Sequence, residues 1–279
     1  MQRNRDGSSM SKSEKRAKTA LQPVQENPEL DPKNQDIDLS RPSRRSEGEP
    51  VNVALVDSSQ TFREGLVAAI QNHSDLRLAG QLDLAEQVFT REDFSGVHVC
   101  LIDVDLRDRS GIEVAHWLKE KHPGLAVLLL SHWDWDVYLV AARVACAAGM
   151  LVRSTPSEEL INQICGAAAG PIYSPDQLHR IRLWKKDVGD RLKKVNAREW
   201  EILWLAAGGY KNRQIAEYLS LSENTVEKYV TRLLEKVRLT SRSSLLAFIY
   251  LNHLDALIRL PDQRRYLYVN PAADGEECG

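Results

Sequence analysis

Five short β-rich runs alternate with helical patterns between residues 51 and 164, and this alternation constrains the fold more than any other feature. The runs lie at residues 51–56, 76–82, 97–102, 125–130 and 150–152. Residues 99–102 and 125–130 are almost continuously aliphatic, which is typical of strands buried on both faces. Strands separated by helices pair in parallel, with helices on both faces of the sheet. The sequence therefore predicts an α/β doubly wound, five-stranded parallel sheet.

Four of these runs end at a polar residue, namely Asp57, Asp103, Ser131 and Arg153. The carboxyl ends of parallel strands meet at one edge of a sheet, where ligands bind in folds of this class. We therefore expect two acids, a hydroxyl and a cation to lie close together. Such a set suits phosphoryl transfer, because a carboxylate can act as the nucleophile while cations neutralise the phosphoryl oxygens.

Two short amphipathic segments flank residues 220–222. In the second segment, residues 223–237, the apolar side chains fall three or four positions apart and line one helical face, which carries Val226, Val230, Leu233, Leu234 and Val237. The opposite face carries Asn224, Lys228, Thr231, Arg232 and Glu235. Ser222 is a good cap for this helix. Two helices joined by such a turn can place the second in the major groove of DNA.

Two further helical patterns surround this pair. One begins at Asn196 and Glu199, which have the spacing of a capping box, and the other begins at Thr240 and Ser241. Four short helices in so few residues form one compact bundle. The second domain is therefore predicted to be an all-α four-helix domain of the helix-turn-helix kind.

The net charge of -2 hides an asymmetry between the two halves of the chain. Residues 51–160 contain 9 Lys and Arg against 16 Asp and Glu, a balance of 9 - 16 = -7. Residues 177–260 contain 16 Lys and Arg against 9 Asp and Glu, a balance of 16 - 9 = +7. The basic half also contains the paired helices, which argues for double-stranded DNA as its partner.

Residues 51–170 resemble the receiver domain of response regulators. The matching pieces are Leu55-Val56-Asp57, Leu101-Ile102-Asp103 with Gly111 eight residues later, Ser131, and the run from Ala148 to Arg153. The resemblance implies that Asp103 accepts a phosphoryl group from a sensor histidine kinase. It also implies that Ser131 and Arg153 contact this group. Asp57 and Asp103 would hold Mg²⁺.

Four residues depart from the receiver pattern. Ser58 stands where a second acid is usual, Arg153 where a lysine is usual, Met150 where an aromatic residue is usual, and Arg107 where a proline is usual. A missing carboxylate weakens a site for a hard dication, and arginine bonds differently from lysine. Asp105 is a candidate for a substitute metal contact. Phosphorylation of Asp103 and a receiver that only dimerises or senses a ligand therefore stay open as alternatives.

Residues 195–254 resemble the LuxR-type helix-turn-helix of NarL/FixJ-family regulators. The matching pieces are the run from Asn196 to Leu203, Gln214-Ile215-Ala216, and the run from Leu221 to Val226 that leads to Tyr229-Val230. The resemblance implies a recognition helix at residues 223–237, in which Lys228, Thr231 and Arg232 reach base edges or phosphates. Further DNA contacts are expected from Lys211, Asn212, Arg213, Asn224, Thr225, Lys236, Arg238 and Arg242.

These features predict a sequence-specific DNA-binding transcription regulator of the two-component response-regulator type. It is expected to bind DNA as a homodimer and not to be an enzyme. The alternative is an interaction module that binds a kinase, RNA polymerase or another regulator and has no specific DNA site of its own. Asp103-Val104-Asp105 also resembles the motif of haloacid-dehalogenase-type phosphatases, but the resemblance is confined to that motif.

Composition divides the chain into a disordered tail at residues 1–50, a receiver-like domain at 51–170, a linker with a short helix at 171–194, a DNA-binding domain at 195–260 and a C-terminal tail at 261–279. Residues 1–50 contain no aromatic residue and five of the 11 prolines, which is typical of disorder. The longest aliphatic run, residues 125–130, is too short to span a bilayer, and the N-terminus lacks a secretory signal. Cys100, Cys146, Cys165 and Cys278 form no CxxC motif, so we expect reduced thiols and a cytoplasmic location.

Overall fold

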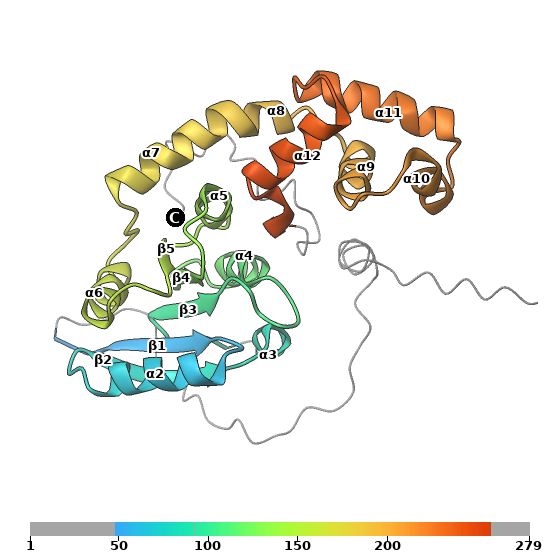
Figure 1. The fold of residues 1–279 in the computed structure, drawn as a ribbon. Helices are drawn as coiled ribbons and strands as arrows, with labels where there is room; N and C mark the ends of the chain where they lie inside the picture. The colour runs from blue at the N-terminus through green and yellow to red at the C-terminus, as the bar shows by residue number, and fades with distance from the viewer. Residues whose placement is uncertain (1–47, 92, 258–279) are drawn as a thin grey trace, which may run out of the picture. The chain divides into compact units, whose positions relative to one another are not determined.

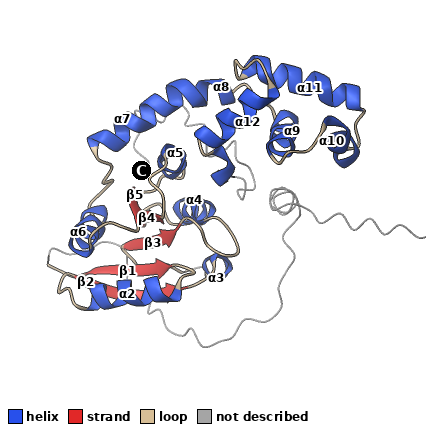
Figure 2. Cartoon of the chain, in the orientation of Figure 1, coloured by secondary structure: helices blue, strands red, loops and turns tan. Residues whose placement is uncertain are grey.

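The computed structural model describes residues 48–91 and 93–257, which divide into two compact units between Gly189 and Asp190 (Figure 1). Residues 1–47 of the predicted N-terminal tail (1–50) and the whole predicted C-terminal tail (261–279) lie outside the described residues. All strands of the described residues belong to the first unit, while the second unit is helical (Figure 2).

The first unit alternates strands and helices, as the sequence predicts. Its elements are β1 (Val51–Val56), α2 (Gln60–Gln71), β2 (Leu76–Leu82), α3 (Ala85–Thr90), β3 (Val99–Asp103), α4 (Gly111–Lys121), β4 (Ala126–Ser131), α5 (Asp136–Val144), β5 (Gly149–Val152), α6 (Ser157–Ala167), α7 (Pro175–Trp184) and the π-helical turn η1 (Lys185–Gly189). All neighbouring strands pair in parallel, in the order β2-β1-β3-β4-β5. The predicted doubly wound sheet is confirmed.

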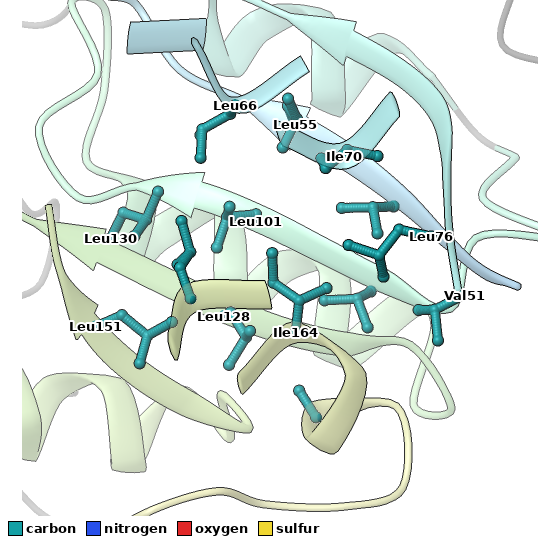
Figure 3. Close-up of a cluster of buried hydrophobic side chains, with 14 of the residues drawn as sticks. Val51, Leu55, Leu66, Ile70, Leu76, Leu101, Leu128, Leu130, Leu151 and Ile164 are labelled. Carbon is teal, nitrogen blue, oxygen red and sulfur yellow. The ribbon is translucent and has the colours of Figure 1, made fainter. Parts of the chain in front are cut away.

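Helices cover both faces of this sheet. Leu66 and Ile70 of α2 and Ile164 of α6 pack on one face (Figure 3). They belong to the same cluster as Leu101 of β3 and Leu128 of β4. Helices α3, α4 and α5 follow one another on the other face (Figure 2). Because β3 is covered on both sides, all of its residues are buried, which explains why residues 99–102 are continuously apolar.

The start of α4 fits closely against the end of β3. Ser110 caps the helix by accepting a hydrogen bond from the amide of Ile112, and the amide of Gly111 donates to the carbonyl oxygen of Val104. A Cβ atom at Gly111 would lie 2.0 Å from the carbonyl oxygen of Asp103, far inside van der Waals contact. Glycine at this position therefore lets α4 begin directly beside Asp103.

The segment expected to be a linker begins as part of the first unit. Helix α7 follows a capping box in which Ser174 and Gln177 each accept a hydrogen bond from the other's amide. The helix packs against α5, and the Gln177 side chain donates to the carbonyl oxygen of Met150 (3.1 Å). The Tyr173 hydroxyl donates to the carbonyl oxygen of Ala147 (3.2 Å). These contacts attach α7 to α5 and to the last strand.

The second unit contains the four predicted helices. Its elements are the short α8 (Asp190–Leu192), α9 (Ala197–Ala207), α10 (Asn212–Leu219), α11 (Glu223–Lys236), α12 (Arg242–Leu251) and the 3-10 turn η2 (Leu254–Leu257). Ile202 of α9, Ile215 of α10, and Val226 and Val230 of α11 form its core. The apolar faces predicted from helical periodicity are therefore confirmed.

Local sequence signals place the ends of these helices. Asn196 and Glu199 form the predicted capping box, and Ser222 caps α11 by accepting from the amide of Thr225. Helix α10 ends at Leu219, and its C-cap Ser220 has a φ of 54° in the left-handed region, which redirects the chain toward α11. The pair α10 and α11 is therefore joined by a tight turn, as predicted.

The cysteine prediction is only partly correct. Cys100 and Cys165 are free thiols, and burial raises the pKa of Cys100 to about 12. Cys146 is disulfide-bonded, so the expectation of a reduced thiol is wrong for this residue. Cys278 lies outside the described residues.

Among the described residues, no helix combines the length and the apolar character needed to cross a bilayer.

Candidate functional sites

The residues predicted at the strand ends lie at one edge of the sheet. Asp57 follows β1, Asp103 ends β3, Ser131 ends β4 and Arg153 follows β5. Nη2 of Arg153 lies 2.6 Å from Oδ2 of Asp57 and 2.7 Å from Oδ2 of Asp103. The structure therefore joins three of the four residues, and we call Asp57, Asp103 and Arg153 the strand-end cluster.

The strand-end cluster is almost completely buried. The side chains of Asp57, Asp103 and Arg153 are 2%, 4% and 8% exposed. The guanidinium of Arg153 also lies over the ring of Phe62, 4.2 Å from its centroid, which is a cation–π contact. Because these charges are removed from water, each depends on its partners to offset the cost of burial.

Backbone amides hold the remaining carboxylate oxygens. Oδ1 of Asp57 accepts a hydrogen bond from the amide of Ser59 (2.7 Å), and Oδ1 of Asp103 accepts one from the amide of Asp105 (3.1 Å). Burial raises the pKa of Asp57, while the Ser59 amide and Arg153 oppose this shift. With both acids ionised, the cluster carries one more negative charge than positive.

The side chain of Ser131 does not join the cluster. Its Oγ is buried and accepts a hydrogen bond from the amide of Trp133 (3.0 Å). Only its backbone is linked to Arg153, whose amide donates to the Ser131 carbonyl oxygen (2.8 Å). The hydroxyl expected to contact a phosphoryl group is thus engaged by the loop that follows β4.

The residues of this edge do not fit Mg²⁺ as they are arranged. Mg²⁺ requires near-octahedral oxygen coordination, but Arg153 already binds both carboxylates of the cluster. The Ser58 hydroxyl donates to the carbonyl oxygen of Asp83 (2.9 Å) and accepts from the amide of Arg107 (3.0 Å). Asp105 is exposed to solvent. Within the described ranges, no three His, Cys, Asp or Glu side chains are grouped so that they could hold a metal ion.

Arg180, which sequence reasoning missed, connects α7 to the loop after β4. Its Nε lies 2.7 Å from Oδ1 of Asp136, and its Nη1 lies 2.8 Å from Oδ2 of Asp134. Nη2 donates to the carbonyl oxygen of Asp134 (2.9 Å). The rings of Trp133 and Trp135 stack in the same loop. The partners of Arg180 lie 44 and 46 residues away in the sequence, so no local pattern could have indicated this contact.

The second candidate site is the polar face of α11. The fold exposes Asn224, Lys228, Thr231 and Arg232, and it buries the opposite face, which carries Val226, Val230 and Leu233. The Thr231 hydroxyl donates to the carbonyl oxygen of Glu227 (3.0 Å). In the part of the chain that the structure describes, neither Lys228 nor Arg232 has a hydrogen bond or an ion pair. Two cations on this face are therefore available to an external partner.

Three other predicted DNA contacts surround this face. Lys211 and Arg213 are exposed at the start of α10, and Arg238 is exposed just after α11. Arg213 pairs with Glu217 on the same helix (3.2 Å), but exposed pairs of this kind are weak. Together with Lys228 and Arg232, these residues form what we call the basic face: Lys211, Arg213, Lys228, Arg232 and Arg238.

The remaining predicted contacts are used inside the unit. Nζ of Lys236 lies 2.7 Å from both carboxylate oxygens of Glu199, which is 2% exposed. Arg242 donates to Oδ1 of Asn212 (3.0 Å), to the carbonyl oxygen of Ala206 in α9 and to that of Tyr210 in the connection between α9 and α10. Thr225 donates its amide to the helix cap. The sequence indicated Glu199 only as a capping residue, and its pairing with Lys236 came from the fold.

Two family models match the chain. One is described as the response regulator receiver domain and matches residues 53–165. The other is described as bacterial regulatory proteins of the luxR family and matches residues 195–249. The two matches fall on the parallel sheet and on the helical bundle, in the order that the sequence predicted.

Curated relatives share both parts of the chain. The uncharacterized transcriptional regulatory protein YxjL of Bacillus subtilis is 30% identical over 209 residues, which cover 72% of this chain and 96% of the relative. The DNA-binding transcriptional activator DevR/DosR of Mycobacterium tuberculosis is 29% identical over 202 residues, which cover 71% of this chain and 93% of the relative.

A solved structure has the same fold. RcsB from Salmonella enterica serovar Typhimurium, bound to promoter P1flhDC in the presence of the phosphomimetic BeF3-, is 20% identical and covers 72% of this chain and 98% of its own, with a TM-score of 0.52.

The domain order, the match along nearly the whole length of the relatives and the two family models agree. The first unit is a receiver fold, and the second is a LuxR-type DNA-binding domain. The chain therefore belongs to the NarL/FixJ family of response regulators, which are DNA-binding transcription regulators of two-component systems.

Proposed function

We propose that this regulator binds specific double-stranded DNA sites as a homodimer through the basic face, and that its receiver controls this binding. The observation that carries the proposal is that Lys228 and Arg232 on α11 are exposed and have no hydrogen-bond or ion-pair partner among residues 48–91 and 93–257. A helix of this width fits the major groove, where Lys and Arg contact guanine edges or phosphates.

The positions on the basic face suggest two kinds of contact. Lys228 and Arg232 lie on α11 itself, and we assign them, with Asn224, to base edges or nearby phosphates. Lys211 and Arg238 lie at the ends of the helix pair, and we assign them to the phosphate backbone, which sets the position of the protein on the duplex.

Lys236 and Arg242 have a different role in this proposal. Their bonds to Glu199 and to Asn212 hold α9, α10 and α12 in place. They position the recognition helix and do not need to touch DNA. The position of Asn212 beside Arg242 gives it the same supporting role.

The homodimer is proposed to read two half-sites related by a two-fold axis. Leu251 at the end of α12 is 78% exposed, and the neighbouring Tyr250 is 50% exposed. Contact with a second copy of the chain would bury the Leu251 side chain, and removing apolar surface from water stabilises such a contact. Helix α12 is therefore the proposed dimer contact in the second unit.

Arg180 supports a route from the receiver to the DNA-binding domain. It ties α7 to the loop after β4, which also holds the Ser131 hydroxyl. The chain runs from α7 through η1 directly into the second unit. A change at the strand ends that moves this loop would therefore move α7. A sensor histidine kinase and an RNA polymerase contact stay predictions.

A gel-shift titration of the full-length protein tests the proposal. Genomic DNA fragments from the source organism are mixed with the protein at several salt concentrations. We expect discrete fragments to be retained, with log K falling linearly as log salt rises. Lys194→Ala, which alters an exposed lysine outside α10 and α11, should leave binding unchanged. If no fragment is retained in dilute buffer, the DNA-binding proposal fails and the interaction-module alternative gains support.

A further inference from the structure

The strand-end cluster contains a cation that belongs to the chain itself. Nη2 of Arg153 bridges Oδ2 of Asp57 and Oδ2 of Asp103 at 2.6 and 2.7 Å. We propose that Arg153 takes the role of the divalent cation in this receiver, so that the site neither binds Mg²⁺ nor becomes phosphorylated at Asp103. The inference deepens the regulatory part of the proposed function, because the signal must then reach the receiver by another route.

Charge neutralisation is the first support. Two buried carboxylates at the same sheet edge repel each other, and a cation between them relieves this repulsion. A guanidinium is planar, always charged and presents several donors, whereas an ammonium is a compact point charge. Arg153 can therefore supply from within the chain the positive charge that a metal would bring from solution.

The hold on the guanidinium is the second support. A metal could reach the two carboxylates only if Arg153 released both of them. Arg153 is 8% exposed and lies over the Phe62 ring, so its release would require a charged group to leave a nearly closed site. Its Nε is buried and has no hydrogen-bond partner among the described residues. The side chain is thus held through Nη2 and the aromatic contact, at the place where it satisfies both acids.

The missing ligands are the third support. Mg²⁺ keeps near-ideal octahedral geometry and needs oxygen donors. Ser58 uses its hydroxyl to join the loop after β1 to Asp83 and to the amide of Arg107. The carboxylates of Asp57 and Asp103 are the nearest oxygen donors. Each of their oxygens already has a hydrogen-bond or ion-pair partner. The chain therefore offers an incomplete set of ligands.

The state of Asp103 extends the inference to phosphorylation. Oδ1 of Asp103 accepts from the amide of Asp105, and Oδ2 faces Arg153. An incoming phosphoryl group needs its own oxygens neutralised by cations. The guanidinium of Arg153 already faces both carboxylates of the cluster through Nη2, so this cation is not available to the phosphoryl oxygens as the site is arranged.

Thermal unfolding of the full-length protein with and without MgCl2, at matched ionic strength, tests the metal part. A ligand that binds the native state raises the melting temperature. We expect no Mg²⁺-dependent change in the wild type. Arg153→Ala should melt at a lower temperature, and Mg²⁺ should raise that temperature by about 5 °C, because two bare carboxylates then face each other. The response should disappear when Asp57→Asn is added to Arg153→Ala.

Arg143→Ala is the matched control. Arg143 also lies over an aromatic ring, 5.8 Å from the centroid of Tyr173, but it bridges no carboxylates in the described residues. This variant should show no response to Mg²⁺. The inference is overturned if Mg²⁺ raises the melting temperature of the wild type and Asp57→Asn abolishes the effect. It is also overturned if Arg153→Ala shows no response to Mg²⁺.

Acetyl phosphate treatment, followed by a phosphate-affinity gel, tests the second part and does not depend on a variant that folds poorly. The wild type should show no shifted band beyond that of Asp103→Asn. A shifted band that Asp103→Asn lacks would overturn the inference. Because neither measurement includes DNA, and the gel-shift titration needs neither Mg²⁺ nor acetyl phosphate, failure of one proposal leaves the other standing.

Discussion

The strand-end cluster and the basic face both concentrate charged residues, but the fold treats the two groups in opposite ways. In the cluster, two acids and an arginine satisfy one another in a nearly closed site. On the basic face, Lys228 and Arg232 point to solvent with no partner in the described residues. Charged residues in a sequence therefore indicate where a site can lie. The folded structure decides whether those residues pair with one another or stay exposed to an external partner.

The largest expected effect is a loss of stability when the strand-end cluster loses its cation. Arg153→Ala should lower the free energy of unfolding by about 3–5 kcal/mol, because it leaves two buried carboxylates without their cation. Urea unfolding in the absence of Mg²⁺ measures the change, with Arg143→Ala as the control that removes an arginine elsewhere in the receiver. A loss below about 1 kcal/mol, as for surface ion pairs, would show that the cluster does not hold its charges as described.

The next largest effect is a loss of DNA binding when cations of the basic face are removed. Lys228→Ala combined with Arg232→Ala should weaken DNA binding roughly 100-fold at low salt and reduce the slope of log K against log salt by about two. The free energy of unfolding should stay the same, because neither side chain has an internal partner. Fluorescence anisotropy at several salt concentrations measures both quantities, with Lys194→Ala as the control.

The same double variant separates the two proposed functions. If DNA binding is intact while regulation of target genes is lost, the basic face contacts a protein instead, and the interaction-module alternative is preferred.

A smaller loss of stability should distinguish Lys236, which pairs with a buried acid, from the exposed Lys228. Lys236→Ala should lower the free energy of unfolding by about 2 kcal/mol, because Glu199 is then buried without its counter-ion. The salt dependence of DNA binding should change little. If Lys236→Ala instead leaves stability intact and reduces the salt slope as Lys228→Ala does, then Lys236 contacts phosphate and the division between inward and outward charges is wrong.

The smallest effect comes from Asp57 and depends on pH. Burial raises the pKa of Asp57 above its ordinary value of 3.8. Between 3.8 and the raised value the native state holds a proton that the unfolded state has lost, so the stability contributed by this group falls as the pH rises through that window.

Asp57→Asn should therefore flatten the acid side of the stability profile. At neutral pH it should change the free energy of unfolding by less than about 1 kcal/mol, since Arg153 keeps Asp103 as a partner. Urea unfolding at a series of pH values measures this. If Asp57→Asn lowered the free energy of unfolding at neutral pH as much as Arg153→Ala does, burial would not disfavour the charged form of Asp57 as the raised pKa indicates.

Local patterns predicted much of the fold correctly. The aliphatic runs at β3 and β4 indicated central strands, because buried parallel strands cannot alternate polar and apolar residues. Ser222, with the helical spacing of Val226 and Val230, indicated helix α11 and its first turn. The strand ends also predicted that Asp57, Asp103 and Arg153 would meet, since parallel strands bring their carboxyl ends to one edge.

The pairings within each site could not be predicted in this way. Lys236 and Glu199 are 37 residues apart, and Arg242 and Asn212 are 30 apart. From the sequence, Lys236, Arg242 and Asn212 were expected to contact DNA, and Glu199 was expected only as a capping residue. Which of them turn inward depends on how α9 packs against α11 and α12, and this is a property of the assembled bundle.

The sequence by itself determined the order of strands and helices, the apolar faces and the residue types at each strand end, because these follow from local backbone preference and from periodicity. Only the tertiary structure decided that Arg153 bridges both acids, that Ser131 is held by its own loop, and that Arg180 ties α7 to that loop. The contacts of Arg153 and Arg180 join residues that are distant in the chain, so they exist only once the elements are packed together. The Arg153 bridge is also strengthened by its burial.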